Sequence, residues 1–250
     1  MKIIICGALG KMGAKLRETA AKTQDVIPVC GVDVKATDLN GFKVYANFGD
    51  IKEKADAVID FSAKATLNSV LDYCLKTATP AVLCSTGYDK NDIAAIKSAS
   101  KKVALFRSAN MSLGVNVLIE TVKFAAKRLY GFDIEIIEKH HNKKTDAPSG
   151  TAIMIKDGIK ELFPDMTETY GRCGLVGARD KKEIGIHAVR GGTIVGEHQV
   201  IFAGDNETLT FTHQAESRDV FAAGAIQAAR FIVNKKNGLF DMKDLITENA

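Results

Sequence analysis

The chain has 250 residues, of which 46% are hydrophobic and 26% are charged, as in ordinary globular proteins. This composition excludes a disordered chain, because enough apolar surface is present to offset the entropy of ordering. No segment approaches the ~20 apolar residues that a membrane helix needs. The 34 basic and 30 acidic side chains leave a net charge of only +4, spread along the chain, so we expect neither a nucleic-acid nor a membrane partner.

The cysteines are odd in number, widely spaced and without a CxxC pair: Cys6, Cys30, Cys74, Cys84 and Cys173. The first apolar run of the chain, over residues 3–6, is far too short for a signal peptide. We therefore expect reduced thiols in a cytoplasmic protein, and no cysteine-based zinc site.

Strand and helix patterns alternate through residues 1–110. Strands are predicted at 2–6, 26–33, 57–61, 81–85 and 103–106, and helices at 11–22, 66–76 and 91–100. The first strand is a continuous apolar run, as is typical of a parallel strand that helices cover on both faces. This alternation predicts an α/β fold with a Rossmann-type, doubly wound parallel sheet.

The pattern changes after residue 110. Helices are predicted at 115–130, 151–163 and 220–234, and strands at 133–138, 185–189, 193–202 and 209–213. The strands on either side of Arg190-Gly191-Gly192 are predicted to form a hairpin. We expect a second, α+β domain with a mainly antiparallel sheet over residues 111–216.

A glycine-rich loop follows the first strand and opens the first helix. Its glycines, Gly7, Gly10 and Gly13, have the spacing GxxGxxG. In a dinucleotide-binding loop the first glycine permits the tight turn, the second lets the backbone approach a pyrophosphate, and the third allows close helix–strand packing. The amide groups at the positive end of the helix would then favour the phosphates. The alternative is that these glycines serve only as turn residues.

Asp33 ends the second strand, where an acidic residue is expected to bind the hydroxyl groups of the adenosine ribose. A carboxylate at this position favours NADH, because it repels the additional phosphate of NADPH. Lys11 and Lys35 are close in sequence and could contact that phosphate. The cofactor is therefore predicted to be NADH or NADPH.

Small residues follow two further strands of the predicted sheet, in Cys84-Ser85-Thr86-Gly87 and Ser108-Ala109-Asn110-Met111. Ligands of open parallel sheets bind beyond the carboxyl ends of the strands. Small side chains there would let a nicotinamide lie close to the backbone. Each segment is equally compatible with an ordinary strand-to-helix turn.

The segment 138–152 is the densest polar stretch of the chain and leads from a strand into a helix. Pro148 suits a helix entrance, and Ser149 can cap the helix. The amide groups of Gly150 and Thr151 would then lie at the positive end of the helix, where a substrate carboxylate fits.

Three histidine and lysine side chains of the same segment, His140, His141 and Lys144, could supply positive charge and a proton. A solvated basic loop without function is one alternative. A metal site is another, but adjacent histidines seldom converge on one ion, and Asp146 is the only nearby acid. We expect no metal. A proton-donating anion site beside a dinucleotide domain accounts for all of the polar residues together.

The segment 138–152 closely resembles the signature of the 4-hydroxy-tetrahydrodipicolinate reductase (dihydrodipicolinate reductase) family, E-x-H-H-x-x-K-x-D-A-P-S-G-T-A. The resemblance extends over nearly the whole chain. Further matches are the glycine loop 7–13, Ser85-Thr86-Gly87, Ala109-Asn110, Gly114-Val115-Asn116, Gly196-Glu197-His198 and Gly238-Leu239-Phe240-Asp241-Met242. The long signature is specific to the family, whereas many dehydrogenases share the glycine loop.

This resemblance implies an enzyme of the diaminopimelate route to lysine. Such an enzyme uses NADH or NADPH to reduce the cyclic product of the synthase that precedes it in that route. His140 would be the general acid/base and Lys144 a second proton donor. The resemblance implies that the dicarboxylate substrate is held by His141, Gly150 and Thr151. It implies that the cofactor-binding site is lined by Gly7, Ala8, Leu9, Gly10, Lys11, Met12, Asp33, Cys84, Ser85, Thr86, Ser108, Ala109, Asn110 and Met111.

The resemblance also implies a domain organisation and an assembly. The dinucleotide-binding domain, 1–110, would be completed by the C-terminal segment 217–250. Residues 111–216 would bind the substrate and join the subunits of a homotetramer through their sheet.

The chain departs from the family pattern at several cofactor positions. Many relatives carry Arg directly after the ribose-binding acid, whereas this chain has Val34, which favours NADH. Lys11 stands where Arg is common, Cys84 where Gly is usual, and Met111 where Phe is frequent. None of these departures touches the expected catalytic residues.

Two other functions are alternatives to the reductase. Another two-domain NAD(P) dehydrogenase, acting on an amino acid or a sugar, would share the glycine loop but would not require the whole polar segment 138–152. A dinucleotide-sensing regulator could keep the loop but would have no use for a proton donor facing the nicotinamide.

Overall fold

The computed structural model describes residues 1–248 and divides the chain into two compact units. The first unit combines Met1–Leu113 with the chain from Arg218 onward, and the second is Gly114–Ser217. Among the described helices, none is long and apolar enough to cross a membrane. The described cysteines form no disulfide, and Cys173 alone among them is exposed.

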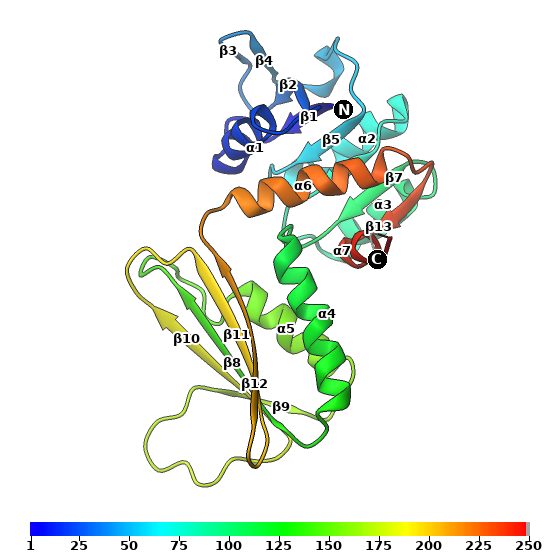
Figure 1. The fold of residues 1–250 in the computed structure, drawn as a ribbon. Helices are drawn as coiled ribbons and strands as arrows, with labels where there is room; N and C mark the ends of the chain where they lie inside the picture. The colour runs from blue at the N-terminus through cyan, green and yellow to red at the C-terminus, as the bar shows by residue number, and fades with distance from the viewer. Residues whose placement is uncertain (249–250) are drawn as a thin grey trace. The chain divides into compact units, whose positions relative to one another are not determined.

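The first unit is built on an eight-stranded sheet with the order β13-β7-β6-β5-β1-β2-β4-β3 (Figure 1). Its strands are β1 (Lys2–Cys6), β2 (Ile27–Val32), β3 (Thr37–Leu39), β4 (Phe42–Tyr45), β5 (Ala57–Asp60), β6 (Ala81–Leu83), β7 (Ala104–Arg107) and β13 (Gly238–Phe240). All neighbours are parallel except β3 and β4. The predicted parallel sheet is therefore confirmed.

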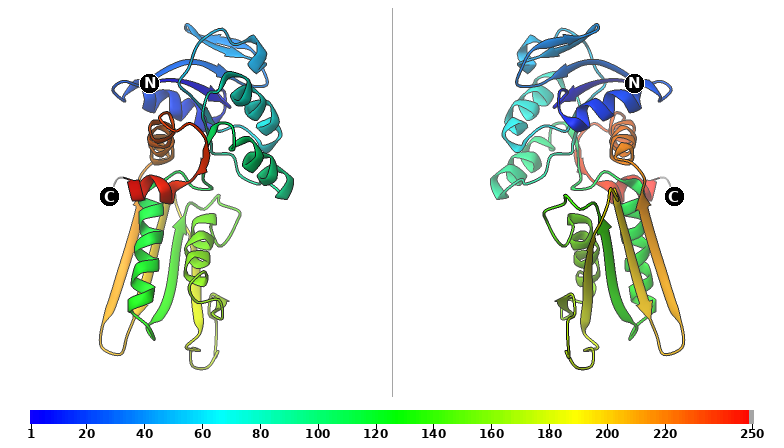
Figure 2. Two further views of the ribbon diagram at one scale, coloured as in Figure 1. Left: turned by 90° about the vertical axis from the view of Figure 1, so that its right-hand side faces the viewer. Right: turned by 90° about the vertical axis from the view of Figure 1, so that its left-hand side faces the viewer.

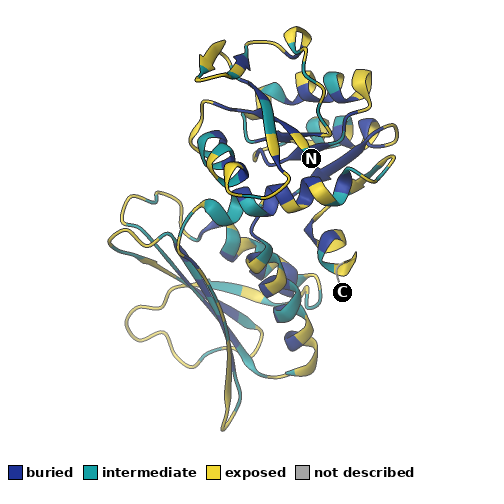
Figure 3. Cartoon of the chain, turned by 45° about the horizontal axis from the view of Figure 1, so that its top comes forward, coloured by how far each residue is buried: buried dark blue, intermediate teal, exposed yellow. Residues whose placement is uncertain are grey.

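Helices cover both faces of this sheet, as a doubly wound fold requires. One apolar core packs α1 (Lys11–Ala21), α6 (Asp219–Ile232) and α7 (Met242–Glu248) against the sheet. The other packs α2 (Leu67–Thr77) and α3 (Lys90–Ala99). Figure 3 shows the central strands almost wholly buried, in keeping with their continuous apolar sequence.

The sequence did not predict four short elements of the first unit: β3, β4, β13 and α7. Each of the three strands has only three or four residues, too few for a periodic pattern to be recognised. The unit also contains two short 3₁₀ helices, Phe48–Asp50 and Lys64–Thr66.

The second unit has a five-stranded sheet with the order β12-β11-β8-β10-β9. Its strands are β8 (Asp133–His140), β9 (Thr167–Tyr170), β10 (Glu183–Arg190), β11 (Gly196–Ala203) and β12 (Thr208–Ala215). Two helices, α4 (Leu113–Arg128) and α5 (Gly150–Lys160), pack on one face of the sheet (Figure 2). The short edge strand β9 was not predicted from the sequence.

Two details of the second sheet correct the sequence-based expectation. The sheet is mixed rather than mainly antiparallel, because β10 runs parallel to both β8 and β9, while β11 is antiparallel to β8 and β12. The predicted hairpin is also wrong, since β8 lies between β10 and β11. Two short-linked strands with a glycine turn look the same in sequence whether or not a third strand separates them.

The link between β10 and β11 instead passes over the carboxyl end of β8. The Gly191 N–H donates to the His140 carbonyl at 2.9 Å, and the Asn142 N–H donates to the Gly192 carbonyl at 3.2 Å. This crossing surrounds the end of β8 with residues from both neighbouring strands.

Candidate active site

The glycine loop of the first unit is a tight turn between β1 and α1. Gly7 has φ +78°, and a Cβ on it would lie 2.8 Å from the Phe61 backbone. A Cβ on Gly13 would lie 2.2 Å from the Gly7 carbonyl oxygen, whereas at Gly10 the distance would be 3.2 Å. The first glycine therefore permits the tight turn, as predicted, and the third lets α1 approach the loop that follows β1.

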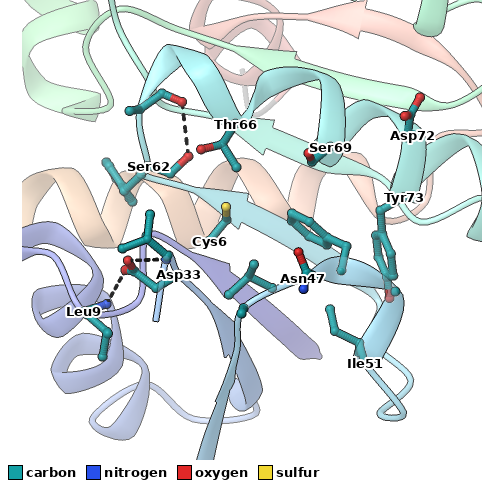
Figure 4. Close-up of a pocket in the computed structure, with 18 of the residues that line it drawn as sticks. Cys6, Leu9, Asp33, Asn47, Ile51, Ser62, Thr66, Ser69, Asp72 and Tyr73 are labelled. Carbon is teal, nitrogen blue, oxygen red and sulfur yellow. Dashed lines mark hydrogen bonds between the residues drawn. The ribbon is translucent and has the colours of Figure 1, made fainter. Parts of the chain in front are cut away.

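A cavity of about 1080 Å³ opens beside this loop, at the carboxyl ends of β1, β2 and β5 (Figure 4). Among the expected cofactor residues, those that line it are Gly7, Leu9, Gly10 and Asp33. Ala8 is instead buried in the core, while Lys11 and Met12 begin α1. Its volume and its position at the glycine loop suit a dinucleotide.

Asp33 connects the glycine loop to the end of β2. Its Oδ2 accepts a hydrogen bond from the Leu9 N–H, and its Oδ1 accepts one from the Val34 N–H, both at 2.8 Å. The side chain of Val34 is 96% exposed beside it at the cavity wall. The carboxylate is therefore held in place at the position where a ribose is expected.

The other expected cofactor residues, Cys84 to Thr86 and Ser108 to Met111, follow β6 and β7 and do not line this cavity. The Ser85 hydroxyl donates to the Ser62 carbonyl at 2.9 Å and lies 3.2 Å from Asp60 Oδ2. Asp60 is fully buried at the end of β5 and was not predicted as a site residue. The signal in the sequence that could have identified Asp60 is an acidic residue at the end of an apolar strand.

The second unit gathers four polar side chains on one face of its sheet. Alternation along β8 places Glu138 and His140 on the same face. Arg190 of β10 is the register partner of His140, and His198 of β11 is the register partner of Glu138. Only the sheet brings these residues together, because Arg190 and His198 are far from the segment 138–152 in the chain.

The Glu138 carboxylate is fully buried and accepts four hydrogen bonds. Arg190 donates to both of its oxygens, at 2.6 and 2.7 Å, while the Ser149 N–H lies 2.9 Å from Oε1. His140 Nδ1 lies 2.6 Å from Oε2. Burial alone would raise the pKa of Glu138, but these hydrogen bonds lower it below its ordinary value.

The His140 imidazole packs edge-on against His198, with ring centroids 5.2 Å apart. Burial lowers the pKa of His140, and the nearby Glu138 carboxylate opposes this shift. Burial also lowers the pKa of His198 to about 4, so that this ring is neutral near pH 7. His198 Nε2 lies 2.9 Å from the Ser149 hydroxyl.

The expected substrate residues surround the start of α5. Ser149 caps this helix by accepting a hydrogen bond from the Ala152 N–H at 3.2 Å, which confirms the predicted cap. Gly150 follows it and is exposed, at the positive end of the helix dipole. Lys144 Nζ lies 2.8 and 2.9 Å from the two carboxylate oxygens of Asp146.

His141 lies beside this segment and is half-buried, and among the described residues its Nδ1 atom has no hydrogen-bond partner. Within residues 1–248, no group of three or more His, Cys, Asp or Glu side chains is arranged to hold a metal ion.

A doubly wound unit with a glycine loop, an anchored ribose-type aspartate and a second unit with a buried Glu–His–Arg cluster defines a class: the two-domain, NAD(P)-type oxidoreductases. Family models for the dihydrodipicolinate reductase N-terminus and C-terminus match residues 1–111 and 114–246. The chain belongs to the dihydrodipicolinate reductase family, and the resemblance seen in the sequence is confirmed.

Individual members of this family are similar to the chain over nearly its whole length. The 4-hydroxy-tetrahydrodipicolinate reductase of Caldanaerobacter subterraneus is 49% identical, covering 98% of both chains. That of Clostridium tetani is 45% identical, covering 97% of this chain and 95% of the other. The dipicolinate-bound dihydrodipicolinate reductase from Paenisporosarcina sp. TG-14 has a similar fold, with a TM-score of 0.83 at 23% identity over 96% of this chain and 97% of that one.

Proposed function

We propose that the chain reduces 4-hydroxy-tetrahydrodipicolinate to tetrahydrodipicolinate and water, consuming NADH or NADPH and one proton. The proposed reaction belongs to the diaminopimelate route to lysine and takes place in the cytoplasm. Membership of the reductase family carries this proposal. Cofactor binding is assigned to residues 1–110 with the C-terminal segment 217–250, and substrate binding is assigned to residues 111–216. The cofactor cavity and the Glu138 cluster support this division.

The proposed mechanism assigns the proton to His140 and the second cationic donor to Lys144. The nicotinamide, when bound, supplies the hydride. Loss of the 4-hydroxyl group as water leaves a conjugated imine, and hydride addition to this imine builds electron density on the substrate ring, which a positioned acid must neutralise. Because Nδ1 of His140 faces Glu138, its Nε2 atom is the one that exchanges the proton. Lys144 also stabilises the developing negative charge.

The dicarboxylate of the substrate is assigned to His141 and to the amide groups of Gly150 and Thr151. The start of a helix favours anions, through its oriented N–H groups and its dipole. Ser149 fixes this helix start by capping α5. The relative from Paenisporosarcina is dipicolinate-bound, and dipicolinate is a cyclic dicarboxylate, as is the proposed substrate.

The proposed assembly is a homotetramer joined through the second unit. Large apolar side chains are exposed there, among them Phe124, Tyr130, Tyr170 and Leu175. The proposed subunit contacts through this unit would cover such side chains. Light scattering of the purified protein should give four times the mass of one chain.

The reaction is tested by following cofactor oxidation on substrate generated in place by the preceding synthase. We expect oxidation that depends on the synthase and on its substrates. A folded protein that binds NADH but oxidises none under these conditions would contradict the reductase, and favour another NAD(P) dehydrogenase. Turnover on no imine at all would favour a dinucleotide sensor.

We further propose that NADH is the preferred cofactor. Asp33 is held by two amide groups, and the exposed Val34 beside it offers no charge to a ribose phosphate. We expect Val34→Arg to raise kcat/KM for NADPH relative to NADH by about tenfold or more, because a charge-assisted hydrogen bond contributes roughly 1.5–3 kcal/mol. Steady-state kinetics with both cofactors measures this ratio.

Ile27→Arg is a matched control for this experiment. Ile27 is exposed at the start of β2, the strand that precedes Val34, and it does not line the cavity. The control should leave the cofactor ratio unchanged. A tenfold change in the control as well would mean that net charge, not a local contact, sets the preference.

A further inference from the structure

We propose that Glu138 is the positioning residue of the reductase site. Its carboxylate, fixed by hydrogen bonds from Arg190, orients the His140 ring and sets its position relative to the start of α5. This inference rests on the proposed function, in which His140 supplies the proton. From the sequence, Glu138 was expected only as the first residue of the family signature, with no role of its own.

The arrangement of hydrogen bonds around the carboxylate carries the argument. Each oxygen of Glu138 accepts two: Oε1 from Arg190 and the Ser149 N–H, and Oε2 from Arg190 and His140. The bidentate arginine fixes the plane of the carboxylate. The remaining acceptor positions then fix His140 and Ser149 relative to each other.

An ionised carboxylate only accepts hydrogen bonds, so the nitrogen of His140 that faces Glu138 carries a proton. The other nitrogen, Nε2, is then left to exchange a proton with a substrate. The space around Nε2 depends on Gly196, because a Cβ there would lie 3.1 Å from that atom. The carboxylate therefore selects both the tautomer and the direction of the ring.

Glu138 is also the anionic group that faces His140 within this cluster. The other groups around the ring are Arg190 from β10, Lys144 from the loop before α5, and His198 from β11. The first two are cationic and lower the pKa of His140, whereas Glu138 raises it. Loss of the carboxylate would therefore make His140 a poorer proton carrier near neutral pH.

The contact with Ser149 extends this control to the substrate. Ser149 caps α5, and the next two residues are the proposed carboxylate-binding positions. The same buried carboxylate thus sets the distance between the proton donor and the anion site. Positioning of this kind accelerates catalysis without any contact between the positioning residue and the substrate.

The opposite face of β8 provides a matched control. Glu135 accepts hydrogen bonds from Arg172, Arg179 and His187, the last at 2.8 Å. These bonds lower the pKa of Glu135 to about 2, although burial opposes the shift. This Glu–Arg–His network has the same chemistry as that of Glu138, but it lies away from the proposed catalytic residues.

The test compares Glu138→Gln with Glu135→Gln in the full chain. We expect Glu138→Gln to lower kcat about 10²-fold or more, as when a catalytic histidine loses its orienting carboxylate. The Kd for NADH should stay within twofold of the parent. The limb of the kcat–pH profile that reports His140 should move to lower pH, because the group that raises its pKa is gone. Glu135→Gln should keep the parent kcat and profile.

Two further variants distinguish positioning from folding. Glu138→Gln leaves the Arg190 charge unpaired, which can unfold the unit. The double variant Glu138→Gln/Arg190→Met removes both charges, and in a folded protein it should still show the low kcat. Glu138→Asp keeps the negative charge but places it farther from His140, because the side chain is one methylene group shorter. Compared with Glu138→Gln, it should recover part of kcat and the pH limb of the parent.

Parent-like kcat and an unshifted pH limb in folded Glu138→Gln would overturn the positioning role while leaving the reductase intact. Recovery of kcat in the double variant would also overturn it, because the loss would then come from the unpaired arginine. Failure of the parent itself to turn over would instead contradict the proposed function.

Discussion

Substitution of His140 by glutamine is expected to lower kcat about 10²–10⁴-fold, the usual contribution of a general acid. Glutamine keeps a polar side chain of similar reach but cannot exchange a proton near neutral pH. The Kd for NADH should stay near that of the parent, because the residues that line the dinucleotide cavity all belong to the first unit. Steady-state kinetics and fluorescence titration with NADH measure the two quantities.

His187→Gln is the matched control for that substitution. His187 also lies on the sheet of the second unit and is hydrogen-bonded to a glutamate, Glu135, at 2.8 Å. We expect this variant to keep kcat within about twofold. Equal losses of kcat and of NADH affinity in His140→Gln would indicate a folding defect, and would contradict a direct role in proton transfer.

The first unit could be predicted from the sequence because its signals are local. The first strand ends in a continuous apolar run, and the glycine loop directly follows it. Asp33 could be identified in the same way, since it ends the next strand. The edge strand β3 and its neighbour β4 escaped prediction because short, half-exposed segments carry no clear period.

The second unit was harder because its order depends on contacts between distant segments. The sequence around residues 183–203 is that of two strands joined by a short glycine turn. Nothing within it shows that β8 inserts between them. The predicted hairpin failed for this reason, and the sheet is not mainly antiparallel because β10 runs parallel to both β8 and the unpredicted β9.

The same limit explains which parts of the candidate site were found. His140, Lys144 and the start of α5 lie in one continuous segment and could be identified from it. Glu138 contacts Arg190 across 52 residues of chain. That contact requires the strand register, which no local pattern in one sequence contains.

Substitution of Gly13 by alanine is expected to damage the dinucleotide site through the backbone. In an ordinary helix this change would stabilise by about 1 kcal/mol. Here the added Cβ would lie 2.2 Å from the Gly7 carbonyl oxygen and 2.7 Å from Ala8 Cα. Both are backbone atoms, so relief requires α1 to move away from the loop. We expect the free energy of unfolding to fall by roughly 1–3 kcal/mol.

Opening of the loop should also weaken NADH binding by about tenfold or more, since 1.4 kcal/mol corresponds to a factor of ten. Gly158→Ala is the control, because the new Cβ would meet only side-chain atoms of Ile119 and Lys123, at 3.3 Å and beyond. Denaturant unfolding and NADH titration of both variants measure the effects. An unchanged NADH affinity with raised stability in Gly13→Ala would mean that the helix can shift without disturbing the turn. The third glycine would then be dispensable, and the phosphates would depend on Gly7 and Gly10 alone.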